Sequence, residues 1–322
     1  ESTGYEAHVK DTSMHHFLHP AFQFNGEELG FWMAKFEPSV ADQSNDCYVN
    51  PSTTNCNKST LIPKIIPNAI SWRYVNVYNT FEISLNLKNK NEIYGWTPKE
   101  VDSHTFTNEE WGAVAYLSAS QYGADSEVWV NSYHEYKTGC AGSHQDSFDE
   151  TVCNEYHTVN GQKASTTHNI YGVYDMSGAS YERTIGNYNN LIGNLIGNSG
   201  FSNNYEIARI ESKYITRYYT SPENMINNFG MDYDSKIYGD AVYETSYDAA
   251  RSHGSQEGWI GNLTNSWNND YTQLLTVNGP WFARGGDTIS ASGTEAGLFH
   301  FHSSIGYAAK YHTFRPVLTP LK

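Results

Sequence analysis

The sequence predicts a mixed α+β chain of short helices and strands joined by long loops. Thr107 and Glu110 are spaced as a capping box at the start of a helix. Residues 314–318, Phe-Arg-Pro-Val-Leu, predict a final strand near the end of the chain. Residues 185–204 are rich in Gly and Asn, and their low helix propensity predicts a long loop or an insertion.

The first third of the chain contains one predicted strand and three predicted helices. Apolar residues 29–36 predict an early strand, which Glu37 and Pro38 end. Residues 71–87 carry both a helical and an alternating apolar pattern, and the length of the segment favours a helix. Residues 97–100, Thr-Pro-Lys-Glu, predict a helix start with proline at its first position. The capping box at Thr107 predicts about three turns that end before Gly123.

Fewer elements are predicted after residue 124. Residues 127–133, Glu-Val-Trp-Val-Asn-Ser-Tyr, alternate between apolar and polar side chains and predict a strand. Residues 221–223, Ser-Pro-Glu, predict the start of a short helix that Gly230 ends. A further helix is predicted over residues 240–251.

The composition excludes some partners. The chain has 35 acidic residues against 20 Lys and Arg, for a formal net charge of -15. We therefore expect no nucleic-acid partner, because no basic patch is available to meet phosphates. The chain is poor in charge at 17% but has 25 Tyr and 26 Gly, a composition shared by many secreted proteins. No run approaches the roughly 20 apolar residues that a membrane-spanning helix needs, so no membrane span is expected.

The four cysteines form two close pairs in the sequence, Cys47 with Cys56 and Cys140 with Cys153. Each pair brackets a short polar loop, which favours local disulfides in an oxidising compartment. Three pairings are open, and we expect the nearest-neighbour one. A metal site is disfavoured because no C-x-x-C spacing occurs. We therefore expect an extracellular protein.

Three blocks resemble the formylglycine-generating-enzyme-like (sulfatase-modifying factor) domain, a variant of the C-type lectin fold. They are Gly-Phe-Trp-Met-Ala-Lys-Phe-Glu at 30–37, Asn-Ile-Tyr-Gly-Val-Tyr-Asp-Met-Ser-Gly-Ala-Ser-Tyr-Glu at 169–182, and the terminal Arg-Gly-Gly…Ala-Gly…Phe-Arg-Pro-Val-Leu. The second block is similar to the family pattern N-x-x-G-[LV]-x-D-M-x-G-N-x-x-E-W. Ala179, Tyr181 and Arg183 depart from it, Ala179 replacing an Asn and the other two replacing the Trp residues that flank the glutamate.

The resemblance implies a fold and a domain plan. The implied fold is α+β and C-type lectin-like, irregular, with long loops, few short helices and small antiparallel sheets. We expect residues 29–322 to form a single such domain, with a loop-rich insertion around 185–280. Residues 1–28 are expected to be a lead-in to this domain. No signal peptide begins at Glu1, so we expect a segment to have preceded it.

The chemistry of the family is not expected to be retained. Formylglycine-generating members use two cysteines in the C-terminal part of the domain to hold copper, a metal that prefers soft thiolates. Here Cys153 is the last cysteine. Related sulfoxide synthases hold iron with an H-x-x-x-H-x-E pattern; His15 and His19 have the first spacing, but Ala21 stands where the Glu belongs. We therefore expect no enzyme and no cofactor, and keep a divergent copper-dependent oxidase as an alternative.

Four charged residues in the resembling blocks are predicted to be structural: Asp175, Glu182, Arg284 and Arg315. A carboxylate buried beside Tyr and Met is costly unless it accepts backbone N–H bonds or meets a cation, which Arg284 or Arg315 could supply. The family often carries a structural calcium ion, so the resemblance leaves a Ca²⁺ site open. A Ca²⁺ ion needs roughly six to eight oxygen ligands, and the sequence has no EF-hand pattern.

The C-terminal block also resembles the variable region of proteins diversified by retroelements. In those proteins a lectin-like scaffold keeps RGG, AG and FR fixed while the residues between them form the ligand surface. The residues of this chain that match that role are polar or aromatic: Asp287, Thr288, Ser290, Thr294, His300, His302, Ser303, Tyr307, Tyr311 and His312. We expect them to form a binding face, since Tyr offers a large contact area at low entropic cost.

The sequence thus predicts a non-enzymatic, adhesin-like protein that binds a protein or glycan ligand on another cell or surface. The helix at Thr107 and the segment before the second block also resemble bacterial surface proteins, in which a prepilin-type segment precedes a lectin-like domain. That resemblance implies a place on the cell surface or a pilus. A pilin-like subunit that packs against copies of itself is the second hypothesis.

Overall fold

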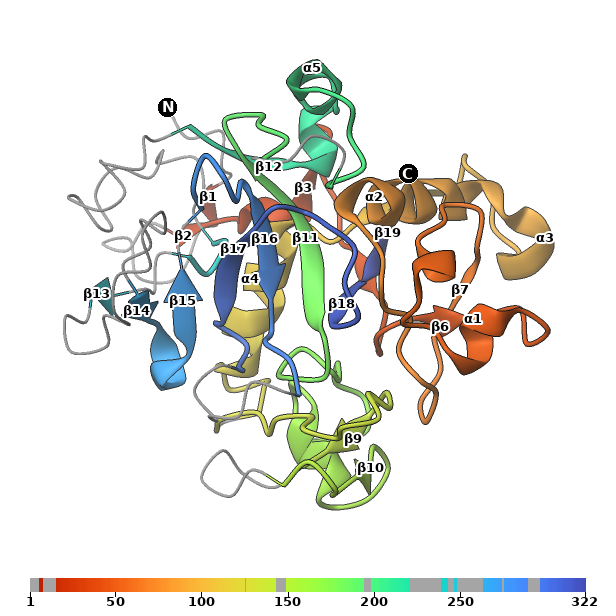
Figure 1. The fold of residues 1–322 in the computed structure, drawn as a ribbon. Helices are drawn as coiled ribbons and strands as arrows, with labels where there is room; N and C mark the ends of the chain where they lie inside the picture. Colours follow the sequence, from red (N-terminus) through yellow and green to blue (C-terminus); the bar gives the residue numbers. More distant parts are fainter. Residues whose placement is uncertain are drawn as a thin grey trace.

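The computed structural model describes residues 6–7, 16–124, 126–142, 149–193, 198–219, 239–242, 246–247, 263–273, 275–288 and 296–322. Across these residues, short helices lie around several small β-sheets (Figure 1). The prediction of an irregular α+β chain with few short helices and small sheets is confirmed at this level.

Short elements make up the described chain. Its α-helices are α1 (Asp46–Val49), α2 (Val77–Asn86), α3 (Asn91–Tyr94), α4 (Asn108–Ser118) and α5 (Asn204–Ala208). Its 3₁₀ helices are η1 (Pro20–Phe22), η2 (Thr54–Cys56), η3 (Leu87–Asn89), η5 (Gly161–Ala164), η6 (Ser212–Tyr214) and η8 (Trp267–Asn269). Its strands are β1 (Glu6–Ala7), β2 (His16–Phe17), β3 (Gln23–Phe24), β4 (Glu27–Glu28), β5 (Trp32–Met33), β6 (Ser39–Val40), β7 (Pro63–Lys64), β8 (Val101–Thr105), β9 (Cys140–Ala141), β10 (Asn154–Glu155), β11 (Tyr181–Tyr188), β12 (Thr216–Tyr218), β13 (Ser246–Tyr247), β14 (Leu263–Asn265), β15 (Tyr271–Gln273), β16 (Trp281–Arg284), β17 (Phe301–Ser304), β18 (His312–Phe314) and β19 (Pro316–Pro320).

The largest sheet is organised around β11. Its strand order is β12-β11-β16-β17-β15-β14-β13, and β18 also pairs with β11. β11 runs antiparallel to β16 and parallel to β12 and β18. Figure 1 shows β11, β16 and β17 at the centre of the molecule with α4 behind them, and β13 to β15 at the left. The segment expected as an insertion, 185–280, supplies β12 at one end of this sheet and β13 to β15 at the other.

A second sheet brings the early and final parts of the chain together. β19 lies between β5 and β8 and is antiparallel to both. The final strand predicted from 314–318 is confirmed, although the structure divides it at Arg315 into β18 and β19. The early strand predicted over 29–36 is confirmed only for Trp32 and Met33.

Two predicted helices are confirmed with their local causes. Asn76 caps α2 by accepting the N–H of Asn79 at 2.9 Å, and Phe81 and Ile83 of this helix are buried in the core. At α4 the capping box is complete: Thr107 Oγ1 accepts the N–H of Glu110, and the Glu110 carboxylate accepts the N–H of Thr107.

The helix at Thr107 is confirmed in extent as well: α4 makes about three turns and ends at Ser118, before Gly123, although its C-cap is Ala119 and not the glycine. Three other predictions of elements are wrong where the structure describes them. Residues 97–100 form a turn that leads into β8, with Glu100 accepting the N–H of Thr97. Residues 127–133 form no strand, and only Asn131 makes a bridge, to Gly178. In the predicted helix at 240–251, residues 240–242 are irregular and Ser246–Tyr247 is β13. The helix start at 221–223 lies outside the described residues.

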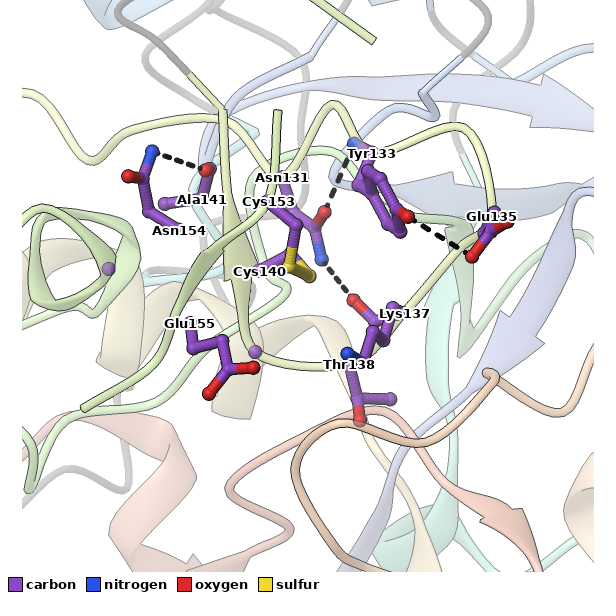
Figure 2. The surroundings of a disulfide bond; sticks show 12 residues. Asn131, Tyr133, Glu135, Lys137, Thr138, Cys140, Ala141, Cys153, Asn154 and Glu155 are labelled. Atoms are coloured by element: carbon purple, nitrogen blue, oxygen red, sulfur yellow. Dashed lines mark hydrogen bonds between the residues drawn. A yellow bond between two sulfur atoms is a disulfide. The ribbon is translucent and has the colours of Figure 1, made fainter. Parts of the chain in front are cut away.

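Both predicted disulfides are present. Cys47 bonds to Cys56 and Cys140 to Cys153, and no free cysteine remains. The second bond joins the short hairpin of β9 and β10 (Figure 2). Beside it, the Asn131 side chain donates to the carbonyl of Lys137 at 3.0 Å and accepts the N–H of Tyr133 at 3.3 Å (Figure 2). Among the described residues, no helix is long and apolar enough to cross a membrane.

Candidate functional site

The C-terminal strands rest on a buried ion pair. Arg315, between β18 and β19, and Glu182, on β11, are both buried, and the guanidinium donates from Nε and Nη2 to the two carboxylate oxygens. Arg315 also donates to the backbone carbonyls of Ala34 and Tyr174, at 2.5 and 2.9 Å. All three resembling blocks therefore meet at one guanidinium.

Asp175 satisfies its buried carboxylate with hydrogen-bond donors. It accepts from the N–H of Gly139 at 2.8 Å, the N–H of Glu37 at 3.3 Å and the side chain of Asn131 at 2.8 Å. Its backbone has a φ of 64°, in the left-handed region. Burial raises the pKa of Asp175, while Arg315 opposes that rise. The expected backbone bonds and nearby cation are thus both found.

A second buried arginine, Arg183, holds the C-terminal loop against β11. Its side chain is fully buried and donates to Ser304 Oγ and the Tyr307 carbonyl at 2.6 Å each, and it contacts His312 Nδ1 at 2.5 Å. Burial lowers the pKa of Arg183 to about 9. Arg183 thereby fixes the segment between β17 and β18, residues 305–311.

Four partly buried aromatic side chains gather above this arginine: Tyr181, His302, Tyr307 and Tyr311, which we call the tyrosine–histidine face. The ring of Tyr181 lies 4.5 Å from that of His302 and 6.0 Å from that of Tyr311, between centroids. The hydroxyls of Tyr307 and Tyr311 are hydrogen-bonded to each other. The face therefore joins β11, β17 and the loop before β18.

The larger binding face that the sequence predicts is wrong in extent. Asp287, Thr288, His300, Ser303 and His312 are buried. Ser303 on β17 and His312 on β18 lie inward because these strands pack into the large sheet. Asp287, Thr288 and His300 lie in buried segments next to β16 and β17. His302, Tyr307 and Tyr311 remain at the surface in part, while Ser290 and Thr294 lie outside the described residues.

Burial and the arginines keep the three histidines neutral. Burial and then Arg183 lower the pKa of His302 to about 3, and burial, Arg183 and His302 lower that of His312 well below its usual value. Burial, His302 and Arg284 do the same to His300. Arg284 itself is buried, with its guanidinium 5.4 Å from the rings of Trp111 and Phe301.

Several ring nitrogens in this cluster lack a hydrogen-bond partner among the described residues. They are Nδ1 and Nε2 of His300, Nδ1 of His302 and Nε2 of His312. A buried polar atom without a partner costs about 1–3 kcal/mol, so each nitrogen favours contact with a polar group. In the part of the chain that the structure describes, no group of three or more His, Cys, Asp or Glu could hold a metal ion.

Sequence reasoning missed Tyr181 and Arg183 as members of the site and treated them only as departures from a family pattern. One signal could have found them. The two residues are separated by one position on a strand, so their side chains share a face of the sheet. β18 pairs directly with this part of β11, and β17 follows β16 in the same sheet.

Comparison of the chain with protein-family models found no match, and comparison with curated proteins found none either. The function of the tyrosine–histidine face is therefore argued from its own geometry.

Proposed function

We propose that this protein is an extracellular, non-enzymatic binding protein that captures a protein or glycan ligand at the tyrosine–histidine face. The observation that carries the proposal is the gathering of Tyr181, His302, Tyr307 and Tyr311, all partly at the surface, over the buried rings of His300 and His312, each of which has a ring nitrogen without a hydrogen-bond partner among the described residues. Tyrosines combine a flat apolar ring with a polar tip, which suits both sugar rings and protein side chains.

The rigidity of the face supports binding. Arg183 holds the loop that carries Tyr307 through two hydrogen bonds of 2.6 Å. His312 lies beneath Tyr307 and Tyr311, with its ring 5.3 and 4.7 Å from theirs. A face fixed before the ligand arrives loses little conformational entropy on binding.

We further propose that the scaffold is C-type lectin-like, of the formylglycine-generating-enzyme-like variant. The meeting of all three resembling blocks at Arg315 supports this, because scattered similarity would not bring them to one point. All four cysteines are in disulfides, which supports a role without thiol chemistry. The two disulfides also support an extracellular location.

The test is removal of the two loop tyrosines. Tyr307→Ser with Tyr311→Ser is expected to weaken binding at least tenfold, because aromatic anchors supply most of the energy of such contacts. The measurement is binding of purified protein to immobilised glycans and to displayed extracellular proteins, followed by titration of each ligand found.

A matched control replaces two exposed tyrosines elsewhere, Tyr122→Ser with Tyr171→Ser, whose side chains are 77% and 86% exposed. This variant should bind as the unmodified protein does. Equal binding by all three proteins, with unchanged thermal unfolding, would remove the tyrosine–histidine face from the proposal.

A further inference from the structure

A groove of about 640 Å³ lies away from the tyrosine–histidine face, between α2 on one side and the segment from Gly200 through α5 to η6 on the other. Figure 1 places α5 at the top of the molecule and α2 to its right. The volume of the groove falls within the range of sites that take small molecules or short chain segments.

The floor of the groove is apolar and firmly packed. Phe81, Phe201 and Tyr214 line it and also belong to one hydrophobic core cluster. The ring of Phe201 stacks on Trp281 of the large sheet at 5.4 Å, and Tyr78 packs edge-on against Phe201 at 5.2 Å. The floor is thus preformed, because its rings are held by residues of the core.

The second wall is anchored as well. Arg217 of β12 donates to the carbonyls of Ile207 and Ile210 at 3.1 and 2.6 Å, and to Asn190 Oδ1 at 2.9 Å. These bonds tie α5 and the residues that follow it to β12 of the large sheet. Both walls therefore keep their separation without a ligand.

The rim of the groove is acidic on both walls. Glu82 extends from α2, and Glu206 and Glu211 come from the opposite wall. The exposed Glu211 carboxylate lies 3.7 Å from Lys213, and Arg209 is the one basic residue among the described residues that line the groove. Glu82 and Glu206 both raise the pKa of Tyr78, which shows that the two carboxylates lie near its phenol. Among the described residues, the Glu82 carboxylate makes no hydrogen bond or ion pair, although burial raises its pKa.

We propose that this groove binds a basic segment of a partner protein, in which a Lys or Arg side chain lies beside an apolar one. The aromatic floor takes the apolar side chain and the stem of the basic one, and the cationic head reaches Glu82 and Glu211. A second copy of the chain fits poorly, since each copy carries a net charge of -15. The same charge speeds the approach of a basic partner.

The test uses a short peptide probe, acetyl-Lys-Leu-Lys-Leu-amide, and its acidic counterpart with Glu in place of Lys. Titration of the whole protein, followed by nuclear magnetic resonance, should shift the signals of residues lining the groove with the basic peptide and not with the acidic one. Glu82→Gln with Glu211→Gln should weaken binding of the basic peptide at least fivefold.

The matched control, Glu27→Gln with Glu92→Gln, changes the net charge equally at exposed positions outside the groove. It should leave the affinity within twofold. Equal weakening by both pairs would show that net charge alone attracts the peptide, and no shift at the groove would show that no basic segment binds there. Either result overturns the proposal and leaves the tyrosine–histidine face untouched.

Discussion

At the scale of single residues, the centre of the protein depends on how three buried carboxyl groups share one guanidinium. Glu182 has direct hydrogen bonds to Arg315, whereas Asp175 is satisfied by backbone and amide donors. Burial, Asp175 and Glu182 together raise the pKa of Glu37 well above its usual value. Burial also raises the pKa of Asp175 and of Glu182, but Arg315 opposes both rises, so we expect Glu37 to be the carboxyl group that holds a proton.

This assignment predicts unequal effects for two similar substitutions. Glu182→Gln leaves Arg315 buried without its direct counter-charge and should cost about 3–5 kcal/mol of the free energy of unfolding. Glu37→Gln replaces a carboxyl that is already neutral, and the new amide oxygen can still accept the N–H of Ser180, now at 2.9 Å. It should cost no more than about 1 kcal/mol.

Urea unfolding of both variants at neutral pH measures the difference. Equal losses would contradict the assignment of the proton to Glu37.

The sequence was informative about these charges but not about Arg183. Asp175, Glu182 and Arg315 lie inside blocks with a recognisable pattern, so a structural role could be predicted from them. The partners of Arg183 are an Oγ on β17, a carbonyl in the loop and an imidazole on β18, all more than 120 positions away in the sequence. No local sequence pattern predicts such contacts. They decide which residues between β17 and β18 stay at the surface, so the extent of the binding face could not be predicted either.

At the scale of elements, α4 shows why a glycine can lie inside a helix. Gly112 is buried where the chain at Gly239 and Asp240 crosses the helix, and a Cβ at this position would lie 1.8 Å from the carbonyl oxygen of Gly239. The missing side chain thus allows a close backbone contact, which compensates for the low helix propensity of glycine.

Gly112→Ala should therefore destabilise the protein by about 1–3 kcal/mol, the cost of overpacking, although alanine normally favours a helix by about 1 kcal/mol. Gly30→Ala is the control, because a Cβ there meets nothing within 4 Å and its φ is not positive. That change should be neutral or slightly stabilising. Thermal unfolding of both variants tests the contact, and a stabilised Gly112→Ala protein would refute it.

The helix predicted from residues 97–100 failed for a physical reason. Thr97 and Glu100 make only half of a capping box: the Glu100 carboxylate accepts the N–H of Thr97 at 2.8 Å, but Thr97 Oγ1 donates to that carboxylate instead of accepting the N–H of Glu100. The next residues pair with β19 instead of continuing a helix. Along all of Val101–Thr105 the backbone groups form hydrogen bonds with β19, so they do not need the hydrogen bonds of a helix. The Thr-Pro-Lys-Glu pattern therefore predicted the turn at 97–100 correctly, but the element that follows is a strand and not a helix.

At the scale of the whole molecule, the partly buried His302 and the fully buried Asp240 make stability depend on pH in opposite directions. His302 has its pKa lowered to about 3 by burial and Arg183. Asp240 has its pKa raised to about 7 by burial, although it accepts bonds from Val242 and Tyr218. Between these values the unfolded chain takes up a proton at His302, while the folded chain keeps one at Asp240.

The signs follow from proton binding in the two states. For His302 the folded pKa lies below the ordinary 6.5, so the unfolded chain binds more protons and stability falls as pH drops from about 6.5. For Asp240 the folded pKa lies above the ordinary 3.8, so the folded chain binds more protons and stability falls as pH rises from about 4 to 7. Each group changes the free energy of unfolding by at most about 1.4 kcal/mol per pH unit.

Two substitutions should therefore tilt the pH profile of stability in opposite directions. Relative to the unmodified protein, His302→Gln should gain stability as pH falls from 6.5 to 4, and Asp240→Asn should gain it as pH rises from 4 to 7. If either substitution also alters a hydrogen bond, the free energy of unfolding changes by the same amount at every pH. The slope of that free energy against pH therefore reports only the loss of the titrating group. Chemical unfolding at pH values from 4 to 7 measures both slopes, and parallel curves for the three proteins would contradict the burial of these two groups.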